Sequence, residues 1–358
     1  MANYTYIHIP FCKQKCKYCS FISYPCLEKI EEYFIALEKE IDLRYSGEKL
    51  KTLYFGGGTP SLIQTKYFEK LINKFNFDLD PEITIELNPD DVNLKYLLEL
   101  KKIGINRLSI GAQTFNDKVL NLIGRRHSSR QTVEAVNLAK KAEFKNISLD
   151  LIYGLPDSNL KSDLEEILKL DIQHISTYGL KIEEESYFGK HIPNNLPDED
   201  IQADMYILIN ETLEKNGFNR YEISNFAKEG YESKHNLNYW NNNEYYGFGI
   251  SAHGYLNGVR YSNYTKFEDY FKTPQCRESE HIQTKSEILE EEIFLGFRKE
   301  AGINTKHINK KFDIDFDEKY KKILERFTPE FIEKTEYGYK LTIKGILLSN
   351  HILSEFII

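Results

Sequence analysis

Three of the five cysteines stand within eight residues near the start of the chain. Cys12 and Cys16 are separated by three residues, and Cys16 and Cys19 by two. Three thiolates on one short loop can bind three irons of a cubane [4Fe-4S] cluster and leave the fourth iron open to an exchangeable ligand. A structural zinc site is the alternative, but it needs four ligands, and no Cys or His follows at finger spacing. The spacing therefore favours an iron-sulfur cluster with one open iron.

Glycine and polar side chains follow short apolar runs further along the chain. The stretch GGGTPS at 56–61 contains Gly57, Gly58 and Thr59. Its backbone can approach a ligand without interference from Cβ atoms, although a glycine triplet alone fits a tight turn equally well. Glu86 ends the next run shortly before a proline. A lone carboxylate at that place is either a ligand contact or a solvated group.

Later runs provide three more polar candidates: Gln113 and Arg125 follow the fourth run, and Asp150 stands within the fifth. Arg125 and Asp150 stand in otherwise apolar strand and loop contexts. Because an isolated buried charge is costly, each of these two groups needs a partner. The simplest expectation is that they pair with each other.

The elements that must position these groups are predicted by six short runs rich in Ile, Leu, Tyr and Val. The runs cover residues 4–9, 52–55, 83–87, 107–110, 147–152 and 174–180. Segments of helical period separate them, which is typical of βα units around a parallel sheet. Six units are too few for the eight of a complete TIM barrel, so we predict an α/β fold with a partial (β/α)6 barrel. In such a barrel ligand-binding groups lie at the C-terminal ends of the strands, where the candidates above stand.

Changes of pattern divide the chain into three predicted parts. Residues 1–225 form the barrel core, and residues 226–285 form a connecting region rich in aromatic residues. Residues 286–358 read as helices followed by a hairpin with its turn at Gly338, a pattern that resembles a winged-helix-like module. This last part has no strong excess of Lys and Arg over acids, which favours packing or partner docking over DNA binding.

Composition excludes several functional classes. The chain has 358 residues, 41 % hydrophobic content and a formal net charge of -8, so it can bury a large core and offers no continuous basic surface to nucleic acid. No apolar run reaches the roughly 18 residues that span a bilayer, and the N-terminus lacks the features of a signal peptide. Cys26 and Cys276 do not form a disulfide framework. We therefore expect a cytoplasmic protein with no nucleic-acid partner and no transmembrane segment.

The cysteine spacing resembles the signature of the radical S-adenosylmethionine (SAM) superfamily. In that family the amino and carboxylate groups of SAM chelate the open iron, and the reduced cluster cleaves the sulfonium to a 5'-deoxyadenosyl radical. The strings GGGTPS, ELNP, RLSIGAQTF, GRRH and LIYGLP narrow the resemblance to the coproporphyrinogen-oxidase-like branch. The resemblance implies that Tyr6, Gly57, Gly58, Thr59 and Glu86 contact this SAM, and that Gln113, Arg125 and Asp150 line a place for a second SAM.

The string HNLNYW at 235–240 contains the only tryptophan of the chain. An exposed histidine beside aromatic rings suits heme, because imidazole can be an axial ligand while the rings pack on the macrocycle. Read alone, His235 fits a hydrogen-bonded histidine in an aromatic cluster better. The motif, however, resembles the heme-associated motif of HemW-type heme chaperones, which implies heme at His235. His253 is a second candidate.

Two features separate the heme chaperones of this branch from its oxidases. Position 21 is Phe21, whereas the oxidases have a further cysteine there. The chain also begins three residues before its first predicted strand, without the extension that in the oxidases helps cover the substrate. The resemblance therefore favours a heme chaperone without coproporphyrinogen oxidase activity. An oxygen-independent coproporphyrinogen III oxidase is the alternative, and a radical SAM methyltransferase is the third reading.

The resemblance also implies partners. A heme chaperone hands heme to acceptor proteins, including respiratory enzymes at the inner face of the membrane. The sequence contains the apparatus for SAM cleavage but no evident general acid or base, so it leaves open whether SAM is turned over. It also leaves the oligomeric state open, with a homodimer as one possibility.

Overall fold

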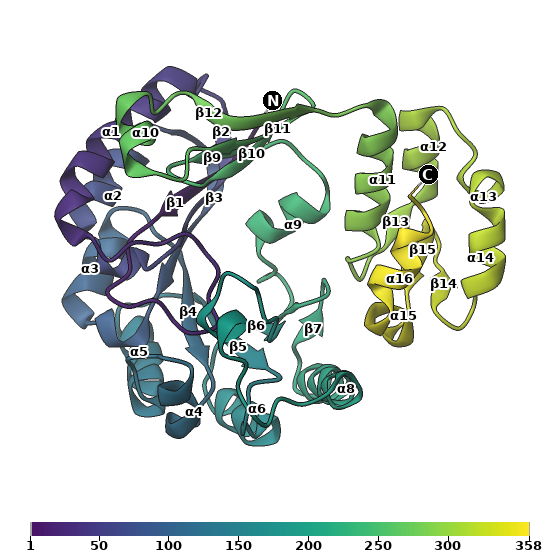
Figure 1. Cartoon of the computed structure of the whole chain (residues 1–358), viewed down its shortest axis with the longest axis horizontal. Coiled ribbons are helices and arrows are strands. Elements are labelled where there is room, and N and C mark those ends of the chain that lie inside the picture. The colour runs from purple at the N-terminus through teal and green to yellow at the C-terminus, as the bar shows by residue number, and fades with distance from the viewer. Residues whose placement is uncertain (1, 358) are drawn as a thin grey trace.

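The computed structural model describes residues 2–357 as a curved parallel sheet wrapped by helices, with a smaller module at one side (Figure 1). The core strands are β1 (Tyr4–Ile9), β2 (Lys49–Gly57), β3 (Asn76–Leu87), β4 (Arg107–Gln113), β5 (Asn146–Tyr153) and β6 (His174–Gly179). Each pairs in parallel with the next. Every run predicted as a strand is a strand, so the α/β class with a partial (β/α)6 barrel is confirmed.

Strands β2 and β3 begin earlier than the sequence predicted. Their first residues, 49–51 and 76–80, are mostly exposed and include charged side chains, so they form no apolar run. Lys49 nevertheless pairs with Asn76, and Leu50 with Phe77. The backbone hydrogen bonds of a sheet do not require apolar side chains, and these two strands continue past the core without them.

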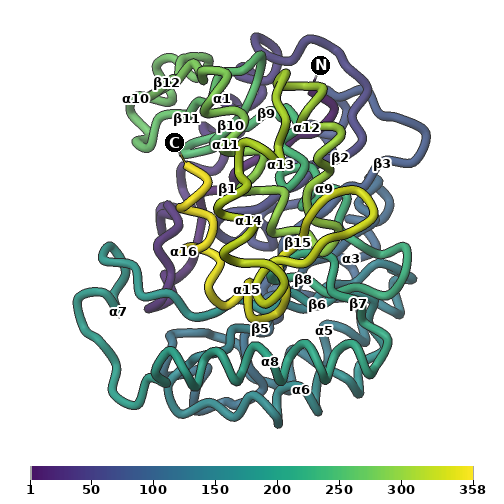
Figure 2. Tube along the Cα trace, turned by 90° about the vertical axis from the view of Figure 1, so that its right-hand side faces the viewer, coloured from purple at the N-terminus to yellow at the C-terminus, as the bar shows by residue number. Residues whose placement is uncertain are grey.

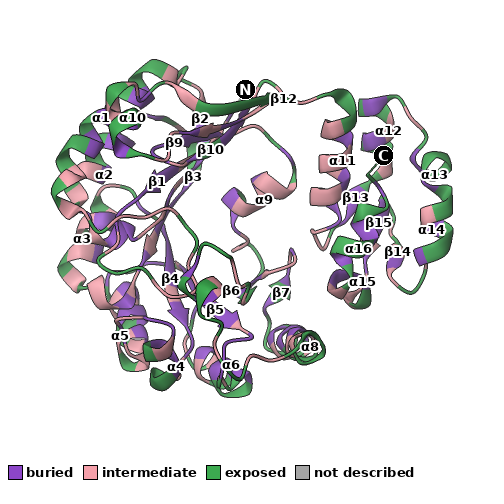
Figure 3. Cartoon of the chain, in the orientation of Figure 1, coloured by how far each residue is buried: buried purple, intermediate pink, exposed green. Residues whose placement is uncertain are grey.

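Helices cover the outer face of the barrel (Figures 1 and 3). They are α1 (Ile30–Arg44), α2 (Thr65–Ile72), α3 (Leu94–Lys102), α4 (Asp117–Leu122), α5 (Ser129–Lys141), α6 (Leu160–Leu168) and α8 (Glu199–Lys215), with the short η1 (Leu27–Lys29), η2 (Pro60–Leu62), η3 (Pro89–Asp91) and α7 (Tyr187–Lys190). Helix α1 buries Phe34, Leu37 and Ile41, which recur at helical spacing and form one apolar face. Within residues 2–357 no helix is long and apolar enough to cross a membrane.

The sheet extends past the core strands at both edges. In the described part of the chain its order is β7-β8-β6-β5-β4-β3-β2-β1-β9. β9 (Tyr246–Phe248) pairs with β1 in parallel, and β8 (Asn225–Ala227) and β7 (Asn219–Arg220) continue from β6 in antiparallel. These strands were not predicted, because two or three residues leave no periodic signal. As a result β1, which leads into the cysteine loop, has partners on both edges.

Helix α9 (Lys234–Trp240) lies on the inner side of the sheet, away from the outer helices (Figure 1). Its His235 shares a hydrogen bond with Thr52 and stacks on the ring of Tyr54, two residues of β2. Ser233 caps the helix by accepting a hydrogen bond from the backbone N–H of Asn236. A short helix therefore covers the inner face of β2.

A small antiparallel sheet and a helix follow β9 and lie beside α1. They are β10 (His253–Leu256), β11 (Val259–Asn263), β12 (Arg277–Ile282) and α10 (Phe267–Lys272). Glu40 of α1 is fully buried and forms an ion pair with Arg44. It also accepts hydrogen bonds from Asn263 Nδ2 (2.8 Å), Tyr270 Oη (2.6 Å) and the backbone N–H of Gly249 (2.8 Å). One carboxylate thus ties this segment to the barrel.

The C-terminal module (residues 285–354) has a hydrophobic core of its own and lies beside the barrel (Figures 1 and 2). Its elements are α11 (Lys285–Gly296), β13 (Ile303–Asn304), α12 (Thr305–Phe312), α13 (Phe316–Lys319), α14 (Lys321–Phe327), β14 (Ile332–Lys334), β15 (Gly338–Leu341), α15 (Ile343–Leu347) and α16 (Ser349–Ser354). The predicted hairpin is β14 and β15, with Gly338 as the first residue of β15. Tyr206 of α8 belongs to the core of the module, so the two parts are packed together.

Candidate functional site

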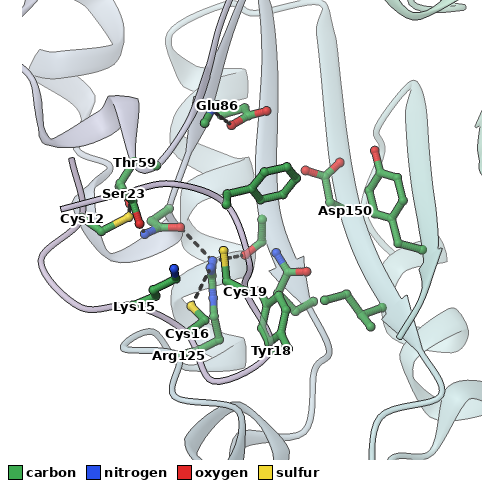
Figure 4. A pocket seen from close by; sticks show the side chains of 18 of the residues that line it. Cys12, Lys15, Cys16, Tyr18, Cys19, Ser23, Thr59, Glu86, Arg125 and Asp150 are labelled. Carbon is green, nitrogen blue, oxygen red and sulfur yellow. Dashed lines mark hydrogen bonds between the residues drawn. The ribbon is translucent and has the colours of Figure 1, made fainter. Parts of the chain in front are cut away.

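A cavity of about 480 Å³ lies where the core strands end (Figure 4). Its wall contains most of the site residues expected from the sequence: Cys12, Cys16, Cys19, Gly57, Gly58, Thr59, Glu86, Gln113, Arg125 and Asp150. These residues are far apart along the chain, and the barrel brings them together because they stand on its parallel strands or in the segments that follow them. The cavity is therefore the candidate site.

The cysteine loop is fixed to the barrel by backbone hydrogen bonds. Near its start, the N–H of Cys12 donates to the carbonyl of Tyr24 (3.1 Å), and the N–H of Tyr24 donates to Pro10 (2.8 Å). In its middle, the N–H of Lys17 donates to the carbonyl of Ile123 (2.9 Å). The first two bonds join the ends of the loop to each other, and the third ties its middle to the barrel, so a loop without regular structure is held in one place.

The thiols meet polar groups at the cavity wall. Cys12 Sγ lies 3.3 Å from the hydroxyl of Thr59, and Arg125 Nη1 donates to Cys16 Sγ at 3.7 Å. Burial raises the pKa of the Cys19 thiol, and the neighbouring thiols Cys16 and Cys12 act in the same direction. A cation that binds the sulfurs would reverse this effect, because it stabilises the thiolate form.

The donor set fits a cluster better than a single metal ion. Among residues 2–357 no three His, Cys, Asp or Glu side chains converge closely enough to hold one ion. The three sulfurs instead stand around the cavity, and its described lining contains no histidine and no fourth cysteine. A [4Fe-4S] cluster binds each thiolate at a different iron, so its ligands need not meet around one point. A structural zinc ion requires four converging ligands and does not fit.

The glycine segment is packed against the first strand and the cysteine loop. Gly57 has φ +113, and a Cβ there would lie 2.4 Å from the ring of His8. A Cβ at Gly58 would lie 2.7 Å from the carbonyl oxygen of Phe11. Both positions thus require glycine for reasons internal to the protein. Their close packing brings the end of β2 against the loop that carries the cysteines.

Two half-buried carboxyl groups form the opposite wall, Glu86 and Asp150 (Figure 4). Glu86 accepts hydrogen bonds from Tyr54 Oη (2.9 Å) and from the backbone N–H of Gly57 (3.0 Å). Burial, together with the nearby Asp150, raises the pKa of Glu86 to about 7. Burial also raises the pKa of Asp150. A cationic ligand in the cavity would stabilise both carboxylates, and SAM carries an amino group and a sulfonium.

Arg125 and Asp150 do not pair with each other, so that expectation is wrong. Arg125 Nη2 donates to Asn88 Oδ1 (2.8 Å) and to the carbonyl of Gly111 (2.7 Å), in addition to its contact with Cys16. Asp150 instead accepts from Ser109 Oγ (3.1 Å). Carbonyl groups bind the guanidinium of Arg125, and a hydroxyl group binds the carboxylate of Asp150. The space between the two side chains therefore remains part of the cavity.

Gln113 reaches the cavity from a left-handed backbone conformation at the end of β4, with φ 67. The turn that follows is fixed by the buried Asp163. This carboxylate accepts hydrogen bonds from Thr114 Oγ1 (2.8 Å) and from the backbone N–H of Phe115 (2.7 Å). Asp163 therefore positions a residue of the cavity wall without lining the cavity itself.

Tyr6 is not part of the cavity lining, contrary to expectation. Its hydroxyl bonds to His8 Nδ1 (3.0 Å), and its ring packs on that of Tyr54, with 6.1 Å between the centroids. Tyr54 itself lines the cavity and binds Glu86. Sequence reasoning missed Tyr54, although the alternation of β2 places it on the same face as Gly56.

His235 is buried, with an exposed fraction of 1 %, and lies hydrogen-bonded in an aromatic cluster, the arrangement that the string alone favoured over an exposed heme ligand. Its Nδ1 shares a hydrogen bond with Thr52 Oγ1 (2.7 Å), and its Nε2 with Tyr239 Oη (2.8 Å). Burial lowers the pKa of His235 to about 3, with a smaller contribution from Arg107. Both ring nitrogens are occupied, so neither can ligate iron in this structure. His253, the second candidate, is exposed on β10 and lies outside the cavity lining.

Buried neutral histidines predict a loss of stability in acid. Burial lowers the pKa of His127 to about 3, and Arg125 acts in the same direction. In the unfolded chain a histidine titrates near a pKa of about 6.5, so below that pH the unfolded state binds a proton that the folded state excludes. His127 therefore contributes stability above about pH 6.5 that is lost progressively as the pH falls toward 3.

We expect the stability advantage of the wild type over His127→Gln to shrink by about 2 kcal/mol between pH 7 and pH 5. Urea unfolding of both proteins at the two pH values measures it. Carboxyl groups with a raised pKa, such as Glu222 at about 7, change the stability in the opposite direction as the pH falls. Both proteins contain these groups, so their effect cancels in the difference between the two. An advantage that stays constant with pH would contradict the prediction.

Comparisons with known proteins find relatives over almost the whole length of the chain. Residues 6–170 match the radical SAM superfamily model, and residues 283–348 match the HemN C-terminal domain. Heme chaperone HemW of Lactococcus lactis subsp. lactis (strain IL1403) is 38 % identical over 370 residues, covering 99 % of this chain and 97 % of that protein. Heme chaperone HemW of Bacillus subtilis (strain 168) is 38 % identical over 373 residues, covering 98 % of each.

Among solved structures, the coproporphyrinogen III oxidase HemN of Escherichia coli has the same fold. The TM-score is 0.86 at 24 % sequence identity, and the match covers 99 % of this chain and 89 % of the oxidase. At this identity the likeness concerns the fold and not the reaction. It extends over the barrel and the C-terminal module alike.

Proposed function

Since the chain belongs to the HemW family within the radical SAM superfamily, we propose that it is a heme chaperone with an iron-sulfur cluster and SAM as cofactors. Cys12, Cys16 and Cys19 hold a [4Fe-4S] cluster in the cavity. When bound, the cluster and SAM supply reductive cleavage of a sulfonium. The observation that carries the proposal is a single cavity that joins these thiols to half-buried carboxyl groups and to a mouth with exposed aromatic side chains.

The protein groups of the cavity suit SAM. Glu86 receives the amino group of the SAM on the cluster, since a carboxylate whose pKa is raised gains most from a nearby cation. The segment from Gly57 to Thr59 contacts the same molecule from the strand end. Gln113 and Asp150, with Arg125 at their side, form the wall that faces the rest of the cofactor or a second SAM.

We place heme at the mouth of the cavity and not at His235. Phe21 and Tyr178 line the cavity with 66 % and 44 % of their surface exposed, and aromatic faces of this kind pack on a planar macrocycle. Lys15 and Lys181 are exposed at the same mouth and can pair with propionate groups. Ligation by His235 would require α9 to leave β2 and break both ring hydrogen bonds.

The proposed task is to deliver this heme to acceptor proteins in the cytoplasm, including respiratory enzymes at the inner face of the membrane. The cluster needs all three thiols reduced, which agrees with a reducing compartment such as the cytoplasm. No substrate is turned over in the delivery itself, so the acceptor must gain as much heme as the chaperone loses. The transfer of heme to any apo-hemoprotein measures this balance.

Heme titration of the anaerobically reconstituted protein, followed by the Soret band, tests the proposal. We expect stoichiometric binding that Phe21→Ala weakens by about tenfold, the effect of removing one well-packed aromatic contact. His235→Ala is the matched comparison and should bind heme like the wild type at neutral pH.

The same sample is assayed with coproporphyrinogen III. Decarboxylation together with indifferent heme binding would assign the chain to the oxidases, whereas methylated product with S-adenosylhomocysteine would assign it to the methyltransferases. Heme binding that is lost in His235→Ala and kept in Phe21→Ala would overturn the placement at the mouth.

A further inference from the structure

We propose that His235 is a positioning residue of the SAM site, which acts through the ring of Tyr54 to set the carboxylate of Glu86. The inference rests on the proposed function in one respect, namely that SAM binds at Glu86. It gives the HNLNYW string a task inside the barrel, where α9 covers the inner face of β2.

A short chain of contacts leads from His235 to the cavity. The imidazole stacks on the ring of Tyr54, with 4.9 Å between the centroids and 25° between the planes. The hydroxyl of Tyr54 then donates to Glu86 Oε1 at 2.9 Å. Tyr54 and Glu86 both line the cavity, but His235 does not. Any effect of His235 on a ligand in the cavity must therefore pass through another side chain.

The imidazole is held so that its face cannot turn. Both ring nitrogens are in hydrogen bonds, with Thr52 Oγ1 at 2.7 Å and with Tyr239 Oη at 2.8 Å. A packed apolar side chain could rotate or slide. A ring held by hydrogen bonds at both nitrogens keeps one orientation toward Tyr54. Tyr54 thus stacks on a fixed surface.

The start of α9 is anchored to the strand that carries Glu86. Glu82 of β3 accepts hydrogen bonds from the backbone N–H of His235 (3.0 Å), the backbone N–H of Lys234 (3.0 Å) and the hydroxyl of Ser233 (3.3 Å). Glu82 and Glu86 are four residues apart on one strand and face the same side of the sheet. The start of α9 is therefore held at a fixed position relative to the carboxylate of Glu86.

The position of the Tyr54 hydroxyl matters for binding. The hydrogen bond to Glu86 favours the ionised carboxylate, the form that attracts an ammonium group. If Tyr54 tilts, Glu86 loses this donor and keeps one from the backbone of Gly57. We therefore expect changes at His235 to weaken SAM without removing any atom that touches it.

The test is SAM affinity of the full-length, anaerobically reconstituted protein with no heme added, measured by equilibrium dialysis. His235→Ala and Tyr54→Phe should each raise the SAM dissociation constant about tenfold, the effect of one hydrogen bond to a charged group. The double variant should bind SAM about as well as Tyr54→Phe alone, because both changes act on the same bond. Iron content is measured in parallel and should equal that of the wild type.

His174→Ala is the matched control. His174 is equally buried, and its ring nitrogens bond to Ser148 Oγ (2.7 Å) and Tyr221 Oη (2.8 Å) in the same pattern. We expect this variant to lose as much thermal stability as His235→Ala and to keep its SAM affinity within about twofold, since it has no ring contact with Tyr54. Equal weakening in both variants would reduce His235 to a structural role and overturn the proposal.

Thr52→Val keeps the experiment decisive if His235→Ala fails to fold. It removes one anchor of the imidazole with little change in volume and should weaken SAM about threefold, a part of the loss expected for one hydrogen bond. Unchanged SAM affinity in Thr52→Val and His235→Ala, or additive losses in the double variant, would overturn the inference. A wild type that holds its cluster but binds no SAM would refute the proposed function itself, a distinguishable result.

Discussion

Replacing Cys16 by serine removes the visible absorption of the reconstituted cluster and reduces bound iron to background. Two thiolates remain on the loop, and a hydroxyl at neutral pH does not replace a thiolate as a ligand of iron. The change also removes the sulfur that accepts a hydrogen bond from Arg125 at 3.7 Å. Iron and sulfide analysis with an absorption spectrum measures the loss, which we expect to be complete.

Cys26→Ser is the matched control for this variant. Cys26 is a free thiol of intermediate burial shortly after the cysteine loop, and it does not line the cavity. Its replacement should leave iron content and SAM affinity at wild-type values. Full iron content and SAM affinity in Cys16→Ser would refute the assignment of the cluster to these cysteines.

The second large effect is expected at Glu40. Glu40→Ala removes the partner of the buried Arg44 and leaves the donors of Asn263 and Tyr270 without their acceptor. Breaking a buried ion pair from one side costs about 3 to 5 kcal/mol, because the remaining charge is left without compensation. The free energy of unfolding at neutral pH, measured with urea, should fall by this amount.

Glu38 on the same helix is the control. It lies 3.9 Å from Lys74, and both side chains are partly exposed, so Glu38→Ala should cost no more than about 1 kcal/mol. A loss of that small size in Glu40→Ala as well would mean that the network around Glu40 contributes little to stability. The contrast between the two variants isolates the effect of burial from that of charge.

The barrel could be predicted because its strands and helices have long, periodic apolar patterns. The cysteine spacing and the strand positions also pointed to residues that the barrel brings together at one cavity, from Cys12 to Asp150. These features are local, in the sense that a few consecutive residues determine them.

The parts that were missed depend on contacts between distant segments. The contact of His235 with Thr52 and Tyr54 follows from the packing of α9 inside the barrel, and the HNLNYW string alone does not identify these partners. The pairing of Arg125 with Asp150 was wrong because Asn88, Gly111 and Ser109 offered closer partners. The sequence shows which side chains are charged, but it does not show which neutral groups lie close enough to form hydrogen bonds with them.

The position of β1 between β2 and β9 has a consequence for biosynthesis. β1 is synthesised well before its second partner, β9, which begins at Tyr246. Until then one edge of β1 carries unpaired backbone groups, a state prone to association with other chains. The loop with Cys12 extends directly from this strand, so its final shape waits for more than two thirds of the chain. We therefore expect the iron-sulfur cluster to enter the protein after β9 has been synthesised.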